Sequence, residues 1–335
     1  MKVTVLSGGV GGARFTRGLL AHLRTTLPDG ARGTTAEITV VANTGDDMWL
    51  HGVRVCPDLD TLMYTLGGVV HEGQGWGRAG ETTRLAADLA GYDVGGDWFT
   101  LGDLDLATHL ARTQLLRAGL SLSAVTQRLA DRWPLGVRLL PMSDQEVETH
   151  VAVDGPVPGG PETLLHFEEW WVRHRAVPVA HRFVQVGLER ASAAPGVVAA
   201  LLDADVVVLP PSNPVVSVGT ILAIPGIREA LVATSAPVVG ISPIVGGAAV
   251  RGMADQCLRA IGVATSAAAV ARHYGRRTSG GVLDAWLVDT VDAADAADLA
   301  ADGWRVGVAP TLMTDIPTTA GIAASALALI ARLHT

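Results

Sequence analysis

Residues 40–65, VVANTGDDMWLHGVRVCPDLDTLMYT, are the stretch that most strongly constrains the fold. Residues 40–43 have the composition of the end of a β-strand, residues 44–47 form a loop, and Pro57 opens a segment in which Leu59, Leu62 and Met63 recur at helical spacing. A strand that leads through a loop into a helix is typical of an open α/β sheet. Such sheets bind ligands at the carboxyl ends of their strands, so this loop is a candidate ligand site.

The same stretch is unusually acidic. Four carboxylates, Asp46, Asp47, Asp58 and Asp60, fall within fifteen residues that are otherwise rich in apolar side chains. Because a buried carboxylate needs hydrogen bonds or a cation, we expect Mg²⁺ to be bound by Asp46, Asp47 and Asp60. For any single carboxylate a structural role is the alternative: Asp58 or Asp60 could cap the helix, and Gly45 with Asp46 could form a turn.

Composition limits the classes of protein to which the chain can belong. Its 335 residues are 49% hydrophobic and 17% charged, which predicts a well-packed globular protein. No apolar run approaches the roughly 18 residues of a membrane-spanning helix, and the first residues do not resemble a signal peptide, so we expect a cytoplasmic protein without membrane association. A net charge of −8 argues against binding to nucleic acid. Cys56 and Cys257 lack metal-binding spacing and are expected to be reduced core residues.

A second strand, loop and helix lie at the N-terminus. VTVL at residues 3–6 is followed by the glycine loop SGGVGGAR at residues 7–14, and Phe15 begins an apolar helix face. Glycines let a ligand approach the backbone, and a helix N-terminus attracts anions. The dinucleotide fingerprint would need glycine at position 14, which weakens an NAD-binding interpretation. A tight turn without a ligand remains the alternative. The candidate phosphate-binding residues are Gly8, Gly9, Gly11, Gly12 and Arg14.

Two later loops share this chemistry. Strand-like residues 205–209 and 238–241 precede PPSNPVVSVG at residues 210–219 and SPIVGG at residues 242–247. In a parallel sheet both loops lie at the same edge as the glycine loop, so we expect all three to converge on one phosphate or nucleotide. The candidates are Ser212, Asn213, Ser217, Ser242, Gly246 and Gly247.

The middle of the chain is less regular. LGDLDLATH at residues 101–109 opens a helix in which Asp103 or Asp105 could be the N-cap, and His109 has no assigned role. Trp170 and Trp171 could stack on a planar ligand, but such aromatic pairs are more often in a core or a subunit interface, and the interface is favoured. The predicted fold is a single α/β domain over residues 1–335. It has a Rossmann-like, mostly parallel sheet with helices on both faces, and residues 103–200 form an inserted, largely helical subregion with some β-structure.

With these motifs in view, the chain resembles the 2-phospho-L-lactate transferase (CofD-like) family, and within it the actinobacterial phosphoenolpyruvyl transferases. The resemblance spans nearly the whole length. It is carried by SGGVGGAR (7–14), NTGDDMWLHG (43–52), PDLDT (57–61), LGDLDLATH (101–109), PMSD (141–144), PPSNPVVSVG (210–219), SPIVGGAAVRGMAD (242–255) and TLMTD (311–315).

The resemblance implies a reaction. A phosphoenolpyruvyl or phospholactyl group would pass from enolpyruvyl- or lactyl-2-diphospho-5'-guanosine to the deazaflavin Fo, releasing GMP and giving a (dehydro) form of coenzyme F-420-0, with Mg²⁺ as cofactor and a homodimer as the assembly. It also implies that Asp60 and Asp47 are catalytic. The residues implied to bind Fo are Asp60, Thr100, Asn43, Gly102 and Asp103.

The chain departs from the family at two positions near Asp103. Some relatives carry a cation at the position of Thr100, and the family commonly has arginine at the position of Leu104. The alternative function is that of a CofD-related, sugar-nucleotide-binding regulatory protein similar to gluconeogenesis factors, which would need the glycine loops but no contacts with Fo. An NAD-dependent oxidoreductase is the third possibility.

Overall fold

A parallel β-sheet runs through the centre of the molecule. The computed structural model describes residues 1–30, 33–92, 98–157 and 159–331. Within these ranges seven strands form the sheet in the order β14-β13-β10-β9-β1-β2-β5, and every neighbouring pair is parallel. The strands are β1 Lys2–Ser7, β2 Glu37–Ala42, β5 Arg138–Pro141, β9 Val206–Leu209, β10 Val238–Ile241, β13 Ala285–Val288 and β14 Val306–Val308.

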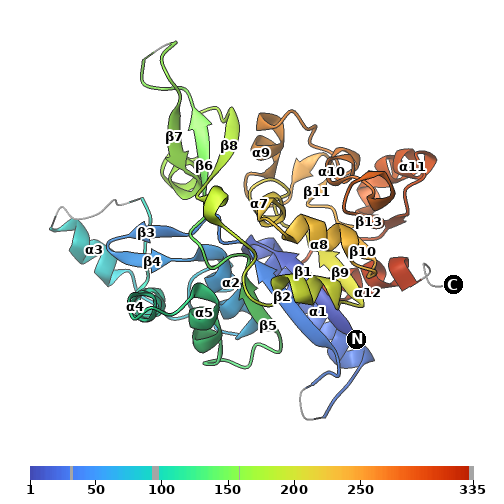
Figure 1. Cartoon of the computed structure of the whole chain (residues 1–335), viewed down its shortest axis with the longest axis horizontal. Coiled ribbons are helices and arrows are strands. Elements are labelled where there is room, and N and C mark those ends of the chain that lie inside the picture. The colour runs from blue at the N-terminus through green and yellow to red at the C-terminus, as the bar shows by residue number, and fades with distance from the viewer. Residues whose placement is uncertain (31–32, 93–97, 158, 332–335) are drawn as a thin grey trace.

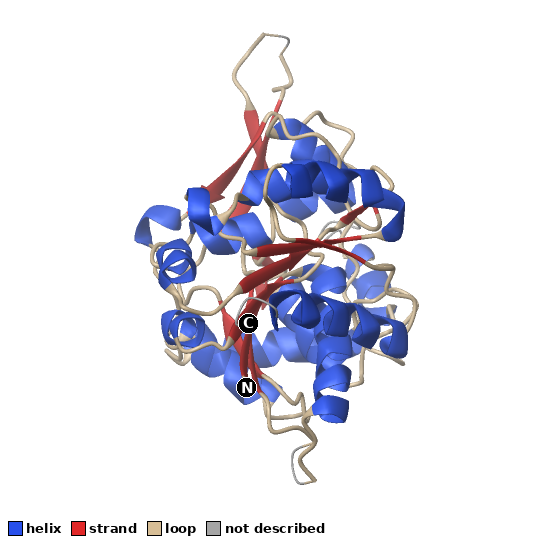
Figure 2. Cartoon of the chain, turned by 90° about the vertical axis from the view of Figure 1, so that its right-hand side faces the viewer, coloured by secondary structure: helices blue, strands red, loops and turns tan. Residues whose placement is uncertain are grey.

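Helices cover both faces of this sheet (Figure 2). Successive strand residues point to opposite faces, so Val5 and Val40 pack with α1, α2 and α12, whereas Leu6 and Val41 pack in the core on the other face. The helices on the face of Val5 are α1 Gly9–Thr26, α2 Pro57–Leu66 and α12 Ile316–Ala331. The helices on the face of Leu6 are α6 Val197–Leu202, α7 Val218–Ala223, α8 Ile227–Ala233, α9 Ala254–Ala260, α10 Ala267–Tyr274 and α11 Ala293–Ala301. The predicted α/β fold is confirmed.

Several elements lie outside the central sheet. They are the hairpin β3 Met48–Leu50 and β4 Val53–Val55, the helices α3 Arg84–Ala90, α4 Asp103–Arg117 and α5 Leu122–Ala130, the small hairpin β11 Ile244–Val245 and β12 Ala248–Ala249, and the antiparallel outer sheet β6 Glu148–Val153, β7 Thr163–His166 and β8 Arg182–Val186. The outer sheet projects from the body of the molecule (Figure 1). Residues 103–200 therefore contribute an edge strand, β5, to the central sheet as well as peripheral structure.

Two helix boundaries differ from the sequence-based expectations. α1 begins at Gly9, within the predicted glycine loop, rather than after it. The apolar pattern near the C-terminus predicts a closing helix over about residues 319–333, whereas α12 starts earlier, at Ile316, and is described as far as Ala331. Residues 332 and 333 of that expectation lie outside the described ranges.

The order of the strands defines a crevice. The chain builds β1, β2 and β5 in one direction and then crosses to β9, β10, β13 and β14 on the other side of β1. The loops that leave β1 and β9 consequently diverge to opposite faces, and ligands of open α/β sheets bind where this happens.

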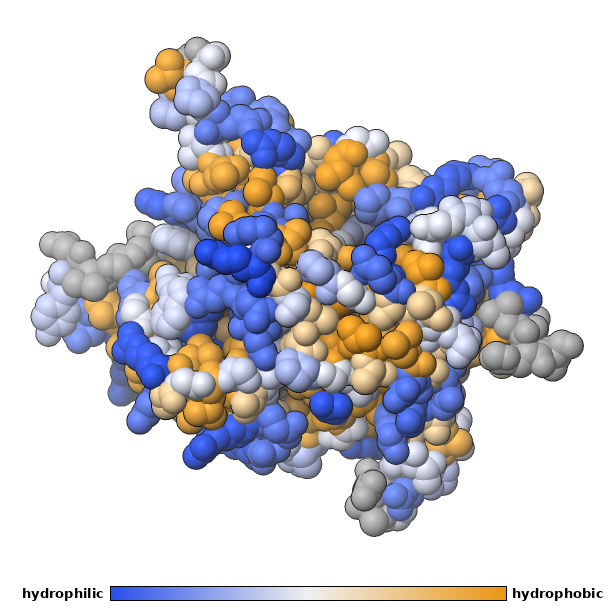
Figure 3. All heavy atoms as spheres, viewed as in Figure 1, coloured by the Kyte–Doolittle hydropathy of each residue, from blue (hydrophilic) through white to orange (hydrophobic). Residues whose placement is uncertain are grey.

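The surface is mixed in character. Apolar and polar side chains are interspersed on the face in Figure 3, with an apolar group near its middle. In the part of the chain that the structure describes, no helix combines the length and the apolar character needed to cross a bilayer.

Candidate active site

A cavity of about 370 Å³ lies at the carboxyl ends of the central strands. Its walls come from the loops after β1, β2, β9 and β10, together with residues near β7 and the start of α9. The predicted phosphate-binding residues that line it are Gly8, Gly9, Gly11, Arg14, Ser212, Asn213, Ser217 and Ser242. Gly12, Gly246 and Gly247 are not among the lining residues. The structure thus brings the three loops together at one place.

The loop after β1 needs glycine because its backbone packs closely against its neighbours. A Cβ atom on Gly8 would lie 2.6 Å from Asp58 Oδ2, and one on Gly12 would overlap Ser7 Oγ. Gly9 has φ +65°, a conformation that other L-residues rarely adopt, and its N–H donates to Asp58 Oδ1 at 2.7 Å. Gly12 therefore serves packing, whereas Gly8 and Gly9 place the backbone beside Asp58.

Asn43 organises two of the carboxylates. It is fully buried at the end of β2, and its Nδ2 donates to Asp46 Oδ2 at 3.1 Å and to Asp58 Oδ2 at 2.9 Å. Asp46 and Asp58 both line the cavity, and Asp46 Oδ1 is buried without a hydrogen-bond partner. Burial raises the pKa of Asp58 to about 6, although hydrogen bonds from Asn43 and Gly9 oppose the rise. Burial, reinforced by Asp58, also raises the pKa of Asp46.

Glu168 is a third buried acid at this place, and the sequence analysis did not identify it. It follows β7, only 5% of its surface is exposed, and burial and the charge of Asp58 raise its pKa to about 8. The same segment places Phe167 and Trp171 in the cavity wall, whereas Trp170 is fully buried and donates from Nε1 to Pro178 O at 2.8 Å. The two adjacent tryptophans therefore have separate roles.

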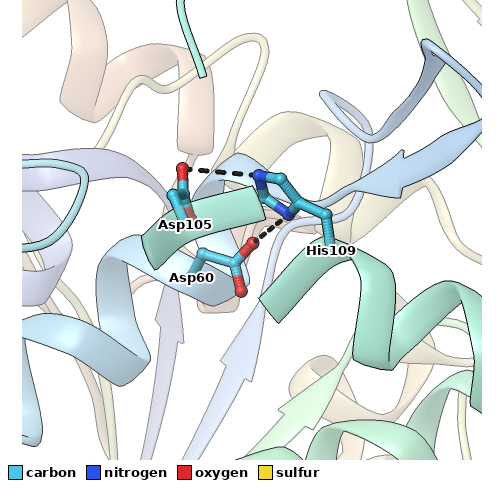
Figure 4. Close-up of side chains that lie close together, drawn as sticks. All are labelled: Asp60, Asp105 and His109. Atoms are coloured by element: carbon cyan, nitrogen blue, oxygen red, sulfur yellow. Dashed lines mark ion pairs between the residues drawn. The ribbon is translucent and has the colours of Figure 1, made fainter. Parts of the chain in front are cut away.

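Asp60 lies in a different environment. It is 4% exposed, is absent from the cavity lining, and accepts a hydrogen bond from Arg112 of α4. The ring of His109 lies between two carboxylates (Figure 4), with Nδ1 3.5 Å from Asp60 Oδ2 and Nε2 3.3 Å from Asp105 Oδ2. Tyr64 donates to the other oxygen of Asp105 at 2.7 Å. Asp60 therefore belongs to a buried charged network between α2 and α4.

The spacing of Asp105, His109 and Arg112 could have revealed this network. Positions i, i+4 and i+7 share one face of a helix, and a buried face bearing three ionisable groups requires partners. Burial lowers the pKa of Arg112, but the charge and hydrogen bond of Asp60, together with Cys56 and Tyr64, outweigh that effect and raise the pKa above its usual value. The guanidinium therefore stays charged.

The structure does not bring Asp46, Asp47 and Asp60 together as one set of metal ligands. Among the described residues, one group of three acidic, histidine or cysteine side chains lies close enough together to hold a metal ion, namely Asp60, Asp105 and His109. There Arg112 already neutralises Asp60. Asp47 is fully buried, neither of its carboxylate oxygens has a hydrogen-bond partner, and burial raises its pKa to about 7 against the opposing charge of Arg54.

Nor do Asp58 and Asp60 cap α2. The N-cap is Cys56, which makes no side-chain capping bond, and both carboxylates bond to groups outside the helix. Cys56 and Cys257 are buried free thiols, as expected.

Comparison with known proteins settles the family. The sequence model of the family described as 2-phospho-L-lactate transferase CofD matches residues 3–306. The chain belongs to the CofD family. It is 57% identical to a phosphoenolpyruvate transferase of Streptomyces avermitilis over 335 residues, covering 100% of both chains. It is 56% identical to the phosphoenolpyruvate transferase of Streptomyces griseus, covering 98% of both chains. It is 52% identical to that of Nocardia farcinica, covering 98% of this chain and 94% of that protein.

A solved structure shares the fold at low sequence identity. A crystal structure of a UPF0052-family protein of Bacillus halodurans superposes with a TM-score of 0.61 at 18% identity, covering 97% of this chain and 98% of that one. The family and the shared name of its relatives identify the chain as a transferase enzyme that acts on phosphoenolpyruvyl or phospholactyl groups.

The remaining residues that the family resemblance assigns to Fo lie at the start of α4 in this CofD-family chain. Thr100 and Asp103 are exposed, and Asp103 accepts hydrogen bonds from Thr82 N at 2.9 Å and Thr82 Oγ1 at 2.8 Å, which lower its pKa. Gly102 is buried where a Cβ would overlap the carboxylate of Glu81. None of the three lines the cavity.

Proposed function

We propose that this CofD-family enzyme moves a phosphoenolpyruvyl or phospholactyl group from a guanosine diphosphate adduct to the deazaflavin Fo, releasing GMP. The observation that supports it is the cavity where three small-residue loops meet buried carboxylates. Its volume of about 370 Å³ is in the range of small-molecule sites. Backbone N–H groups, serine hydroxyls and an arginine suit a diphosphate, and the acids suit its metal.

In this proposal the donor occupies the cavity. The start of α1 and the hydroxyls of Ser212, Ser217 and Ser242 would bind the diphosphate, because they line one continuous wall. Trp171 offers a partly exposed aromatic face in the same cavity, on which a planar base could stack. The terminal ribityl oxygen of Fo would form a bond to the phosphorus that carries the three-carbon acid, while the bond from that phosphorus to GMP breaks.

We propose that Asp46 and Asp58 are the carboxylates that hold Mg²⁺. Asp46 lines the cavity, and its Oδ1 is buried without a hydrogen-bond partner, which is the condition expected of an oxygen that awaits a cation. Mg²⁺ takes oxygen ligands and, when bound, would offset the charge of the diphosphate. Asn43 would orient both carboxylates through its amide.

The acceptor would approach from the side of α4. Asp58 lines the cavity and Asp60 bonds to Arg112 of α4, so the first turn of α2 borders both the proposed donor site and α4. We propose that Asp60, with Asp47 nearby, receives the proton that leaves the Fo hydroxyl. Burial raises the pKa of both carboxylates, and the charge of Arg112 opposes that rise.

Mass spectrometry of a defined reaction tests the proposal. Purified protein, Fo and Mg²⁺ are incubated with either enolpyruvyl- or lactyl-diphosphoguanosine, and we expect GMP and the corresponding form of F-420-0. A regulatory nucleotide-binding protein would bind the adduct but would not quench Fo fluorescence or form product, and that result would reject the proposal. Light scattering of the same sample measures whether the implied homodimer forms.

A further inference from the structure

Two loops that are distant in sequence meet at the mouth of the cavity. One comprises residues 71–77, before α3, and the other comprises residues 246–253, before α9. Arg251 Nη2 donates to Gln74 O, and the Arg251 guanidinium lies over the indole of Trp76, 5.5 Å from the ring centroid. Gly75 presses the first loop against α1, since a Cβ there would lie 2.7 Å from Val10 Cγ1. Trp76 and Arg251 both line the cavity.

The cavity contains two positive side chains. Among the described lining residues, the basic side chains are Arg14 of α1 and Arg251. Neither forms an ion pair with another described residue. Their bonds go to backbone carbonyls: Arg14 Nη2 donates to Glu72 O at 3.4 Å, and Arg251 to Gln74 O. The nearby carboxylate of Glu72 instead pairs with Arg17 at 2.6 Å. Neither cation is therefore held in an ion pair, although Glu72 lies near enough to Arg14 for the charge of Arg14 to lower the pKa of Glu72.

The two arginines also interact electrostatically. Burial lowers the pKa of Arg251, and the charge of Arg14 lowers it further, so the two guanidinium groups are close enough to repel one another. Neither arginine bonds to the cavity carboxylates Asp46 and Asp58, whose hydrogen bonds come from Asn43 and Gly9. The two arginines therefore form a positive site separate from the acidic one.

We propose that Arg14 and Arg251 form a subsite for an oxyanion of the donor, with Trp76 holding the Arg251 guanidinium in place. A guanidinium presents its N–H groups in a planar fork that fits a phosphate or a carboxylate. The donor carries both kinds of group, in its diphosphate and in its three-carbon acid. The inference rests on the proposed function, because that function supplies an anionic donor to this cavity.

Calorimetry and kinetics on two variants test the subsite. Arg251→Gln removes the charge, and Arg259→Gln on α9 is the control because Arg259 is exposed and pairs with Asp255. GMP and GDP are titrated in the presence of Mg²⁺, and KM is measured for the complete donor. A lost charge-assisted contact is expected to weaken the affected ligand by about tenfold or more, with kcat nearly unchanged. Arg251→Lys should recover part of the loss.

The pattern of effects identifies the bound group. Weaker GDP with unchanged GMP would assign the subsite to the β-phosphate, and weaker binding of both would assign it to the α-phosphate. An increase in the donor's KM alone would assign it to the carboxylate. If Arg251→Gln binds GMP and GDP and uses the donor as Arg259→Gln does, the subsite is disproved. If the parent neither binds GDP nor forms product, it is the proposed function that fails.

Discussion

The ion pair of Asp60 and Arg112 determines what a substitution at Asp60 can show. Both side chains are buried, and Arg112 also donates to Arg54 O at 3.2 Å. Asp60→Asn would leave Arg112 charged and buried without the carboxylate to which it donates, and breaking a buried ion pair in this way typically costs about 3–5 kcal/mol. We therefore expect a clear loss of unfolding free energy in urea, before any effect on turnover is considered.

A double-mutant cycle separates folding from catalysis at this position. Asp60→Asn combined with Arg112→Gln removes both charges, so its destabilisation should be smaller than the sum of the single effects. Strictly additive losses would show that the two residues are not coupled. Turnover can be attributed to Asp60 only in a variant whose unfolding curve shows that it is folded at the assay temperature.

Glu168 should make stability depend on pH. Its pKa of about 8 in the folded state exceeds the ordinary value of 4.5. Between those values the folded protein keeps a proton that the unfolded chain has lost, so stability falls as pH rises toward 8 and is constant above it. Glu168→Gln lacks this titration. Its free energy of unfolding, relative to that of the parent, should therefore increase by about 2 kcal/mol between pH 6.5 and 8.5.

Urea unfolding at the two pH values, in chelator, measures this gain. Glu189→Gln is the control because that side chain is 70% exposed, and it should follow the parent at both pH values. Parallel pH profiles for Glu168→Gln and the parent would contradict the assignment of a buried, protonated Glu168.

At the scale of elements, the contact between α1 and α12 depends on a glycine. A Cβ on Gly18 would lie 2.8 Å from the backbone carbon of Thr319 and still closer to its side chain. Gly18→Ala should therefore force the helices apart and destabilise the protein by about 1–3 kcal/mol. Gly321 on α12 has no heavy atom within 4 Å of such a Cβ, so Gly321→Ala should instead stabilise by about 1 kcal/mol.

Thermal unfolding of the two variants checks this prediction. The same chemical change is made on two packed helices, so an intrinsic preference of alanine for helices would raise both midpoints equally. A raised midpoint for Gly18→Ala would show that α1 and α12 do not approach as closely as the structure indicates.

At the scale of the whole molecule, the cavity joins segments from residue 8 to residue 313, so a ligand that fills it should stabilise the entire fold. We expect GDP at a hundred times its Kd to raise the free energy of unfolding by about 2.7 kcal/mol, and Mg²⁺ at a hundred times its Kd to add a similar increment. Each increment is measured as a higher unfolding midpoint. A chelator should remove the Mg²⁺ increment. Asp46→Asn should lose that increment while retaining the response to GDP.

Asp203→Asn is the matched control for this experiment, because Asp203 is exposed at the end of α6 and away from the cavity. It should respond to both ligands as the parent does. An undiminished Mg²⁺ increment in Asp46→Asn would move the proposed cation site away from Asp46.

The sequence by itself determined the architecture and the place of the cavity. Strands of a parallel sheet are buried on both faces, so residues 206–209 are continuously apolar and residues 3–6 are apolar except for Thr4, and both runs can be recognised without their partners. Because all carboxyl ends then lie at one edge, loops that are far apart in sequence had to meet there, and Gly8, Ser212 and Ser242 do so. The motifs also indicated the family.

Only the tertiary structure decided which acid serves which site. Asp58 and Asp60 are two positions apart on α2, which turns them about 200° around the helix axis. Asp58 consequently reaches Gly9 and Asn43, whereas Asp60 reaches Arg112. No local sequence pattern reveals these partners, because they come from α1, the end of β2 and α4. Glu168 arrives from the outer sheet. The charge balance of a buried group is set by the residues packed around it, and these are brought together only by the complete fold.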